Sequence, residues 1–116
     1  MKFLCLAYGE AKDWNGLSKK EQDELLERDE ILRKRGALMA AAETKVLTVR
    51  AWDGKPEVTH GAFADSSVPL AGFSLIDAAD VNEVIRLVAG TPCARAKGAI
   101  EIRPITVIND DGLRPR

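Results

Sequence analysis

The sequence predicts one α+β domain, an antiparallel sheet with helices on one face and an inserted β-hairpin. Three observations lead to this prediction. Apolar runs mark strands near both ends of the chain, capped helical patterns lie between them, and a strong hairpin signal occupies the middle. The chain has 116 residues, 46% of them hydrophobic, which is enough to bury one modest core.

The first strand is predicted at residues 2–8, KFLCLAY, which are apolar on both alternating faces, as in a central strand covered on both sides. Ser18 followed by Glu21 forms a capping box, in which each side chain satisfies a backbone donor at the start of a helix. The helix carries an apolar stripe that includes Leu25 and Leu32. Gly36 should end it, because glycine tolerates the left-handed conformation after a helix.

Three further strands and a second helix are predicted after Gly36. Residues 37–42, ALMAAA, are predicted as a strand because a capped helix ends just before them, and residues 70–76, LAGFSLI, form another. Asp77 or Asp80 caps a second helix. Its buried stripe is Val81, Val84, Ile85 and Val88, and Gly90 and Pro92 end it. A last strand, GAIEIRPI, completes a domain over residues 1–105, and residues 106–116 form a polar C-terminal tail that should be loose.

The hairpin joins KVLTVRAW to KPEVTH through Asp53-Gly54, which predicts a two-residue turn of type I′ with positive φ at both positions. This turn fixes the register and places Leu47 opposite His60. His60 therefore lies on the aliphatic face of the hairpin, together with Val58.

In chain order these elements form a ferredoxin-like split β-α-β with an inserted hairpin. Two helices cover only one face of such a sheet, although the strands are apolar on both faces. The simplest way to bury the second face is against a copy of the chain across a two-fold axis. We therefore expect a homodimer formed through the sheet face.

Composition narrows the classes of partner. With 17 basic and 18 acidic residues, the net charge of −1 gives no reason to expect nucleic acid binding. Cys5 and Cys93 stand outside any C-x-x-C spacing, so we expect reduced, packed thiols and neither a metal site nor a disulfide framework. We find no cofactor motif, no signal peptide in MKFLCLAYGE and no apolar run that could span a membrane, so we expect no cofactor, no membrane partner and a cytoplasmic location.

Several ordered segments resemble one known family. They are MKFLCLAYGE, the helix ending in RKRGAL, the Trp-Asp-Gly-Lys-Pro hairpin, THGAFADSSVPLAGFSLID and GAIEIRPI, spread over residues 1–105. Together they resemble the YCII-related family, in the branch named for its Asp-Gly-Pro-Phe motif. The resemblance implies a dimeric α+β barrel of bacterial origin and a functional link to extracytoplasmic-function sigma factors. It does not imply a particular reaction.

The chain departs from the branch at its motif. Where the branch has Asp-Gly-Pro-Phe, this chain has His60-Gly61-Ala62-Phe63. Where the branch continues Ala-Glu-Thr-Lys-Glu-Gln-Leu-Gly-Gly, it has the segment ADSSVPLAG, residues 64–72. The aspartate, the lysine and the second glutamate of the motif are replaced, and Asp65 is the acid that remains. Chemistry that needs those three charges is therefore not carried over.

His60 is the leading candidate for a site residue, as a general base or a ligand-orienting group that lines a pocket. Asp65 is the second catalytic candidate. The candidates for ligand binding are Phe63 as an apolar wall, Ser66 and Ser67 as polar partners, and the hydroxyl of Tyr8. The structural alternative is a histidine whose nitrogens are satisfied by backbone groups, and a tyrosine at the margin of the core.

Two functions follow from these candidates. The first is a non-catalytic homodimer that binds an unidentified small molecule or has a regulatory role. The alternative is a small-molecule lyase, isomerase or dehalogenase, in which His60 transfers a proton inside a cavity of each subunit. A ligand-sized cavity that exposes His60 would favour the enzyme.

Overall fold

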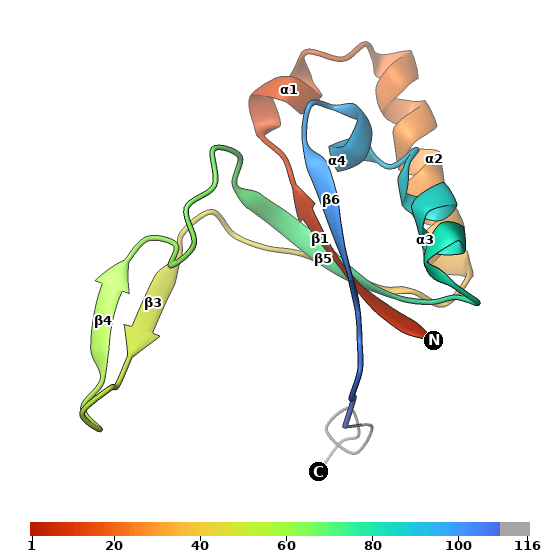
Figure 1. Cartoon of the computed structure of the whole chain (residues 1–116). Coiled ribbons are helices and arrows are strands. Elements are labelled where there is room, and N and C mark those ends of the chain that lie inside the picture. The colour runs from red at the N-terminus through yellow and green to blue at the C-terminus, as the bar shows by residue number, and fades with distance from the viewer. Residues whose placement is uncertain (110–116) are drawn as a thin grey trace.

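A computed structural model describes residues 1–109 and contains a four-stranded antiparallel sheet and a separate two-stranded hairpin. The strand order of the large sheet is β2-β5-β1-β6. Its strands are β1 (Lys2–Tyr8), β2 (Leu38–Ala41), β5 (Leu70–Asp77) and β6 (Ala99–Pro104). This is the order of a ferredoxin-like sheet with a hairpin inserted between its second and third strands, so the predicted α+β fold is confirmed (Figure 1).

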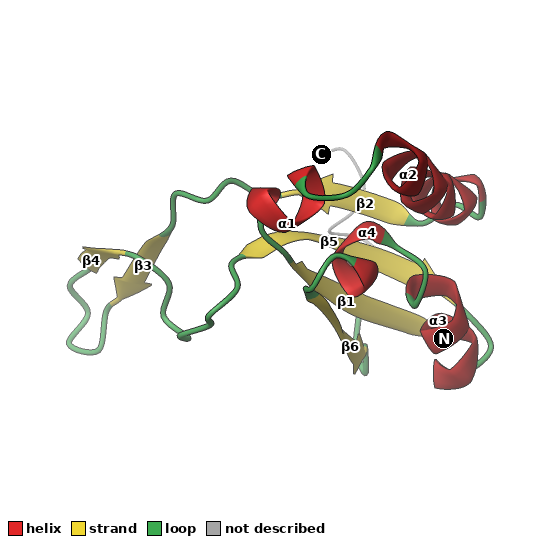
Figure 2. Cartoon of the chain, turned by 90° about the horizontal axis from the view of Figure 1, so that it is seen from above, coloured by secondary structure: helices red, strands yellow, loops and turns green. Residues whose placement is uncertain are grey.

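Four helices lie over one face of this sheet (Figure 2): α1 (Ala11–Asn15), α2 (Lys19–Lys34), α3 (Val81–Val88) and α4 (Pro92–Arg95). The long helix begins at the predicted capping box, with reciprocal hydrogen bonds of 3.1 Å between Ser18 and Glu21. It ends before Gly36, whose φ of 91° is the expected left-handed conformation. None of the helices in residues 1–109 combines the length and apolar composition that a membrane span requires.

The second predicted helix is α3, which ends before Gly90 as expected, although its apolar stripe is only partly buried. Of the two capping candidates, Asp80 caps α3, since its carboxylate accepts from the Glu83 N–H. The stripe of α3 buries Val84 and Val88 but leaves Val81 and Ile85 exposed, because both lie on the flank of the helix that turns away from the core. The short helices α1 and α4 were not predicted. Pro92 follows the end of α3, as expected, and also stands in the first turn of α4.

The core lies between the helices and the sheet. Phe3 and Cys5 of β1 pack there with Ile76 of β5 and with Leu32 and Val88 from the helices. Phe3 and Cys5, which the alternation of β1 places on one face, are therefore buried in the core as predicted.

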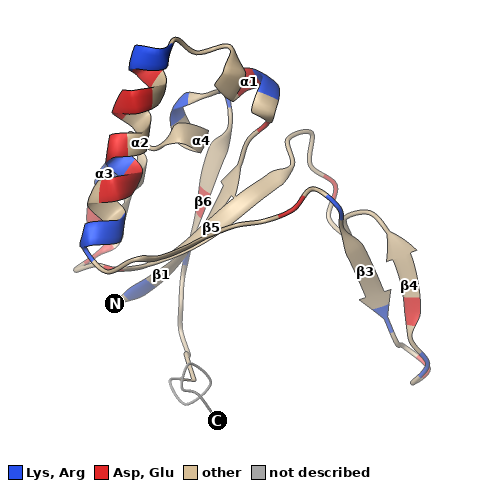
Figure 3. Ribbon diagram, turned by 180° about the vertical axis from the view of Figure 1, so that it is seen from behind, with Lys and Arg blue, Asp and Glu red and all other residues tan. Residues whose placement is uncertain are grey.

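The other face of the sheet is apolar and has no covering layer in the described chain. Leu4 pairs with Leu75, and Leu6 pairs with Phe73, all on the face opposite the helices and half-buried. Leu38 of β2 extends this surface and is 53% exposed. Charged residues gather instead on α2, as Figure 3 shows. We call the apolar surface of the sheet opposite the helices the open sheet face; it consists of Leu4, Leu6, Leu38, Phe73 and Leu75.

The segment between β2 and β5, residues 42–69, forms an arm that projects away from the sheet (Figure 1). It contains the hairpin of β3 (Leu47–Arg50) and β4 (Glu57–His60), in the predicted register with Leu47 opposite His60. The aliphatic face of the hairpin is exposed, including Leu47 and Val49 at 63% each. The apolar side of the arm is therefore not covered by other described residues of the chain.

The prediction of a type I′ turn at Asp53-Gly54 is wrong. The ladder stops at Arg50 and Glu57, and of the two turn residues only Gly54 has positive φ, at 86°. The Gly54 N–H donates to the Ala51 carbonyl over 3.0 Å, and the Asp53 carboxylate accepts from the Lys55 N–H. Because its side chain satisfies that N–H, Asp53 keeps an ordinary φ and the loop is longer than two residues.

The predicted polar tail falls largely outside the described residues, which end at Asn109.

Candidate functional site

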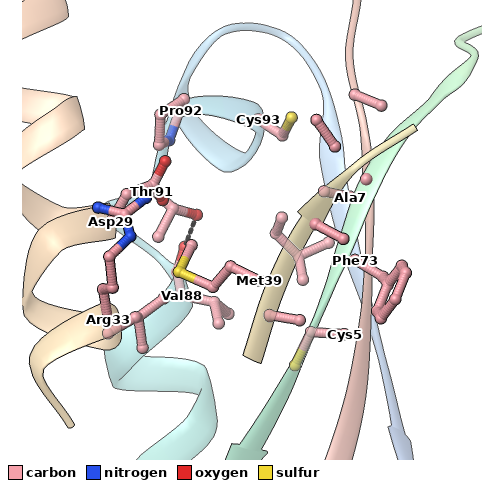
Figure 4. A pocket seen from close by; sticks show the side chains of 17 residues that line it. Cys5, Ala7, Asp29, Arg33, Met39, Phe73, Val88, Thr91, Pro92 and Cys93 are labelled. Atoms are coloured by element: carbon pink, nitrogen blue, oxygen red, sulfur yellow. Dashed lines mark hydrogen bonds between the residues drawn. The ribbon is translucent and has the colours of Figure 1, made fainter. Parts of the chain in front are cut away.

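A cavity of about 270 Å³ lies between the helices and the sheet. Helix α2 and the segment from Val88 to Cys93 form one wall, and strands β1, β2, β5 and β6 form the other. Figure 4 shows Asp29, Arg33 and Thr91 on the helix side and Cys5 and Met39 on the sheet side. Most of the remaining lining is aliphatic, with Leu32, Met39, Val88 and Ile100 among it.

Asp29 is the carboxylate of this cavity. It stands in the middle of α2, between the buried residues Leu25 and Leu32 and on their side of the helix. Burial raises the pKa of Asp29, and the charge of Arg33 one turn later partly opposes this effect. The acids that precede Asp29 on the same helix, among them Glu24 and Glu27, are exposed.

Two further polar groups face the cavity beside Asp29. The hydroxyl of the buried Thr91 donates to the Val88 carbonyl over 2.6 Å, so its oxygen is left to accept a hydrogen bond. Burial raises the pKa of the Cys93 thiol, and the nearby Asp29 charge raises it further. The thiol is therefore kept protonated near neutral pH.

The second thiol of the cavity, Cys5, is also kept protonated. It lies in the core on β1, opposite Ser74 on β5. Burial raises its pKa more than the hydrogen bond with Ser74 lowers it. Both cysteines are free, as we expected for reduced, packed thiols.

A second cavity, of about 250 Å³, adjoins the first beneath α1 and α4. Ala71, Pro92 and Cys93 line both cavities, so Cys93 stands at their common wall. On its other side the Cys93 sulfur packs against Gly9, where an added Cβ would lie 2.9 Å from it. The second cavity also contacts Trp14 of α1.

The structure does not bring the predicted site residues together at either cavity. His60 lies at the exposed end of β4 in the arm, and Phe63, Asp65, Ser66 and Ser67 follow it on exposed backbone. Tyr8 ends β1 on the face opposite the helices. The two cavities described above are lined by other residues. The catalytic and binding roles of these residues remain predictions.

Two of the predicted site residues, Phe63 and Ser66, do have defined contacts. The guanidinium carbon of Arg50 lies 5.2 Å from the centre of the Phe63 ring and 5.7 Å from that of Trp52. Arg50 therefore lies within cation–π distance of both aromatic rings. The Ser66 hydroxyl donates to the Val68 carbonyl over 2.6 Å, which shapes the return of the arm to β5.

Sequence reasoning missed Asp29 and did not connect Cys93 with a site. A signal for Asp29 was present, because positions 25, 29 and 32 follow the four- and three-residue steps of one helical face. An acid between two buried leucines on that stripe is out of place on a solvated face. No comparable signal marked Cys93.

Metal binding finds no support in the geometry of residues 1–109, where no group of three or more His, Cys, Asp and Glu side chains could hold an ion. Comparison with curated proteins gave no match. A family model described as the YCII-related domain matches residues 1–109, which is nearly the whole chain. Its match agrees with the ferredoxin-like sheet and with the segments that resemble this family, and the chain therefore belongs to the YCII-related family.

Proposed function

We propose that this YCII-related protein is a homodimer that binds a small organic molecule and does not convert it. The observation that carries the proposal is the cavity between α2, α4 and the sheet. Its volume of about 270 Å³ is close to the lower limit for small-molecule sites, and its aliphatic lining with a few polar groups is typical of them.

The state of the polar groups favours binding over catalysis. A thiol acts as a nucleophile only as the thiolate, and burial raises the pKa of both Cys5 and Cys93. Asp29 carries neither a hydrogen bond nor a salt bridge to another described residue, so no side chain orients it as a member of a catalytic pair. The cavity therefore has groups that recognise a ligand, without an activated nucleophile.

The homodimer is supported by two unpartnered apolar surfaces on one chain. One is the open sheet face, and the other is the aliphatic side of the arm with Leu47, Val49 and Val58. Two separate exposed apolar surfaces are unusual on a monomer. A two-fold axis lets each copy bury both surfaces at once, because the arm of one chain can lie along the sheet of the other.

The net charge of −1 offers little repulsion to such self-association. A second copy is favoured over a different protein because the two surfaces belong to the same chain and are both aliphatic. The arm also brings His60 and its neighbours to the region where the partner would lie.

Light scattering tests the assembly. The wild-type protein should have twice the chain mass of 12.6 kDa at micromolar concentration. Leu6→Glu places a charge at the centre of the open sheet face and should give the monomer mass. Ile85→Glu, on the exposed side of α3, is the matched control and should leave the dimer intact. A wild-type monomer, or equal masses for the two variants, would overturn the dimer through this face.

Titration with benzyl alcohol, a neutral probe of suitable size, tests the cavity. We expect amide shift changes at Ala7, Thr91 and Cys93 at low-millimolar concentration. Ala7→Leu should fill the cavity and remove these changes, whereas Ala79→Leu at an exposed site should not. Shift changes confined to residues outside the cavity would contradict the proposed site.

A further inference from the structure

We infer that the cavity takes a small organic cation, an ammonium group on an apolar body, and that the Asp29 carboxylate anchors it. The inference rests on the proposed function, because it names the ligand class of the same cavity. It adds a charge preference that an aliphatic cavity alone would not have.

The first argument is that Asp29 lacks a counter-charge. Among residues 1–109 its carboxylate makes no hydrogen bond and no salt bridge. Arg33, the basic residue that lines the same cavity, is bound to Glu30 on the outer side of α2. Its guanidinium is thus shared with another acid and only weakly compensates Asp29.

The second argument is energetic. A carboxylate taken partly out of water without a partner loses solvation, and protein structures normally compensate for such a loss. Burial is the larger of the two effects on the pKa of Asp29 and raises it, so this loss is not compensated within the chain. A ligand ammonium would supply the missing partner through charge-assisted hydrogen bonds.

The third argument concerns the neighbouring polar group. The Thr91 hydroxyl has already donated its hydrogen to the Val88 carbonyl and can offer only lone pairs to a ligand. Asp29 and Thr91 therefore present acceptors at the same end of the cavity (Figure 4). An ammonium group, which has several donors and no acceptor, fits two acceptors, whereas a carboxylate ligand would meet repulsion from Asp29.

The rest of the cavity sets the size and polarity of the ligand body. Leu32, Met39, Val88 and Ile100 give it an aliphatic surface. A volume of about 270 Å³ holds on the order of ten non-hydrogen atoms at the density of protein interiors. A monoamine with a short hydrocarbon or single-ring body meets both conditions.

Two probes of equal size test the charge preference. Benzylamine is a cation at neutral pH, and benzyl alcohol is its neutral counterpart. Both are titrated into the ¹⁵N-labelled protein, and dissociation constants are read from the amide shifts of Ala7, Thr91 and Cys93. We expect benzylamine to bind at least about tenfold more tightly.

Asp29→Asn preserves the shape of the side chain and removes its charge. It should therefore lower the affinity for benzylamine to that for benzyl alcohol. Asp23→Asn is the matched control, because Asp23 is an exposed acid of the same helix that pairs with Lys19 over 3.3 Å. It should leave the preference for benzylamine unchanged.

The outcomes separate the two proposals. Equal binding of both probes to the wild-type protein overturns the charge preference and leaves small-molecule binding in place. A preference that survives Asp29→Asn overturns the role of Asp29. If neither probe shifts the cavity amides, the proposed function fails together with this inference. The wild-type comparison stands even if the Asp29 variant folds poorly.

Discussion

Gly72→Ala should strongly destabilise the protein, because Gly72 lies where β5 meets β2 at the wall of the cavity. A Cβ at this position would lie 2.2 Å from the Ala40 carbonyl oxygen, an atom of the backbone that cannot rotate away. Relief of this contact requires β2 to move by roughly 1 Å, which strains the local packing. The hydrogen bond from the Ala42 N–H to the Ala71 carbonyl, 2.8 Å long, lies beside the contact and would be lengthened.

Overpacking of this kind costs about 1 to 3 kcal/mol, and a lost backbone hydrogen bond adds about 1 kcal/mol. We therefore expect a loss of about 2 to 4 kcal/mol in the free energy of unfolding, measured by urea denaturation with circular dichroism. Gly16→Ala is the control, since its Cβ would come no closer than 3.5 Å to the Lys12 carbonyl oxygen and its φ is −76°. That variant should stay within about 0.5 kcal/mol of wild type. Equal stability of the two variants would refute the pairing of β2 with β5.

Three further substitutions address the site and the arm. Asp29→Asn should raise the thermal midpoint at neutral pH, because it removes a charge that burial disfavours. Burial raises the pKa of Asp29 in the folded state. The cost of the charge is therefore present above that pKa and is lost as the pH falls below the ordinary value of 3.8. A gain that persists unchanged in acid would show that charge is not its cause. His60→Ala should change the free energy of unfolding by less than about 0.5 kcal/mol, because the side chain is exposed; a loss well above that value would indicate a structural role. Gly54→Val should cost about 1 kcal/mol or more through left-handed strain at φ 86°, and an unchanged thermal midpoint would contradict this turn geometry.

Local signals in the sequence predicted much of the fold. The Ser18 capping box, the stop at Gly36 and the pairing of Leu47 with His60 each depend on a few adjacent residues, and each is present. The predicted turn type at Asp53 was wrong because the hydrogen bond between the Asp53 carboxylate and the Lys55 N–H competes with the backbone geometry that Asp-Gly favours.

The candidate site was not predictable in the same way. The cavity is formed by α2, by the end of α3 and by four strands, so its lining depends on long-range packing. The position of Asp29 between Leu25 and Leu32 was a usable signal. The residues from Thr91 to Cys93, which line the cavity beside Asp29, follow the end of α3, where the sequence indicates only a loop. The arm attracted the functional prediction because its residues were chemically diverse, although the position of the arm relative to the sheet is not encoded locally.

The most direct test of small-molecule binding in the cavity is the measurement of intermolecular nuclear Overhauser effects between benzylamine and the methyl groups of the protein. Binding beside Asp29 predicts contacts from the probe to the methyl groups of Leu32, Met39 and Val88, which line the cavity around that carboxylate. Contacts only to Leu47 and Val58 of the arm, or none at saturating probe, would contradict the site.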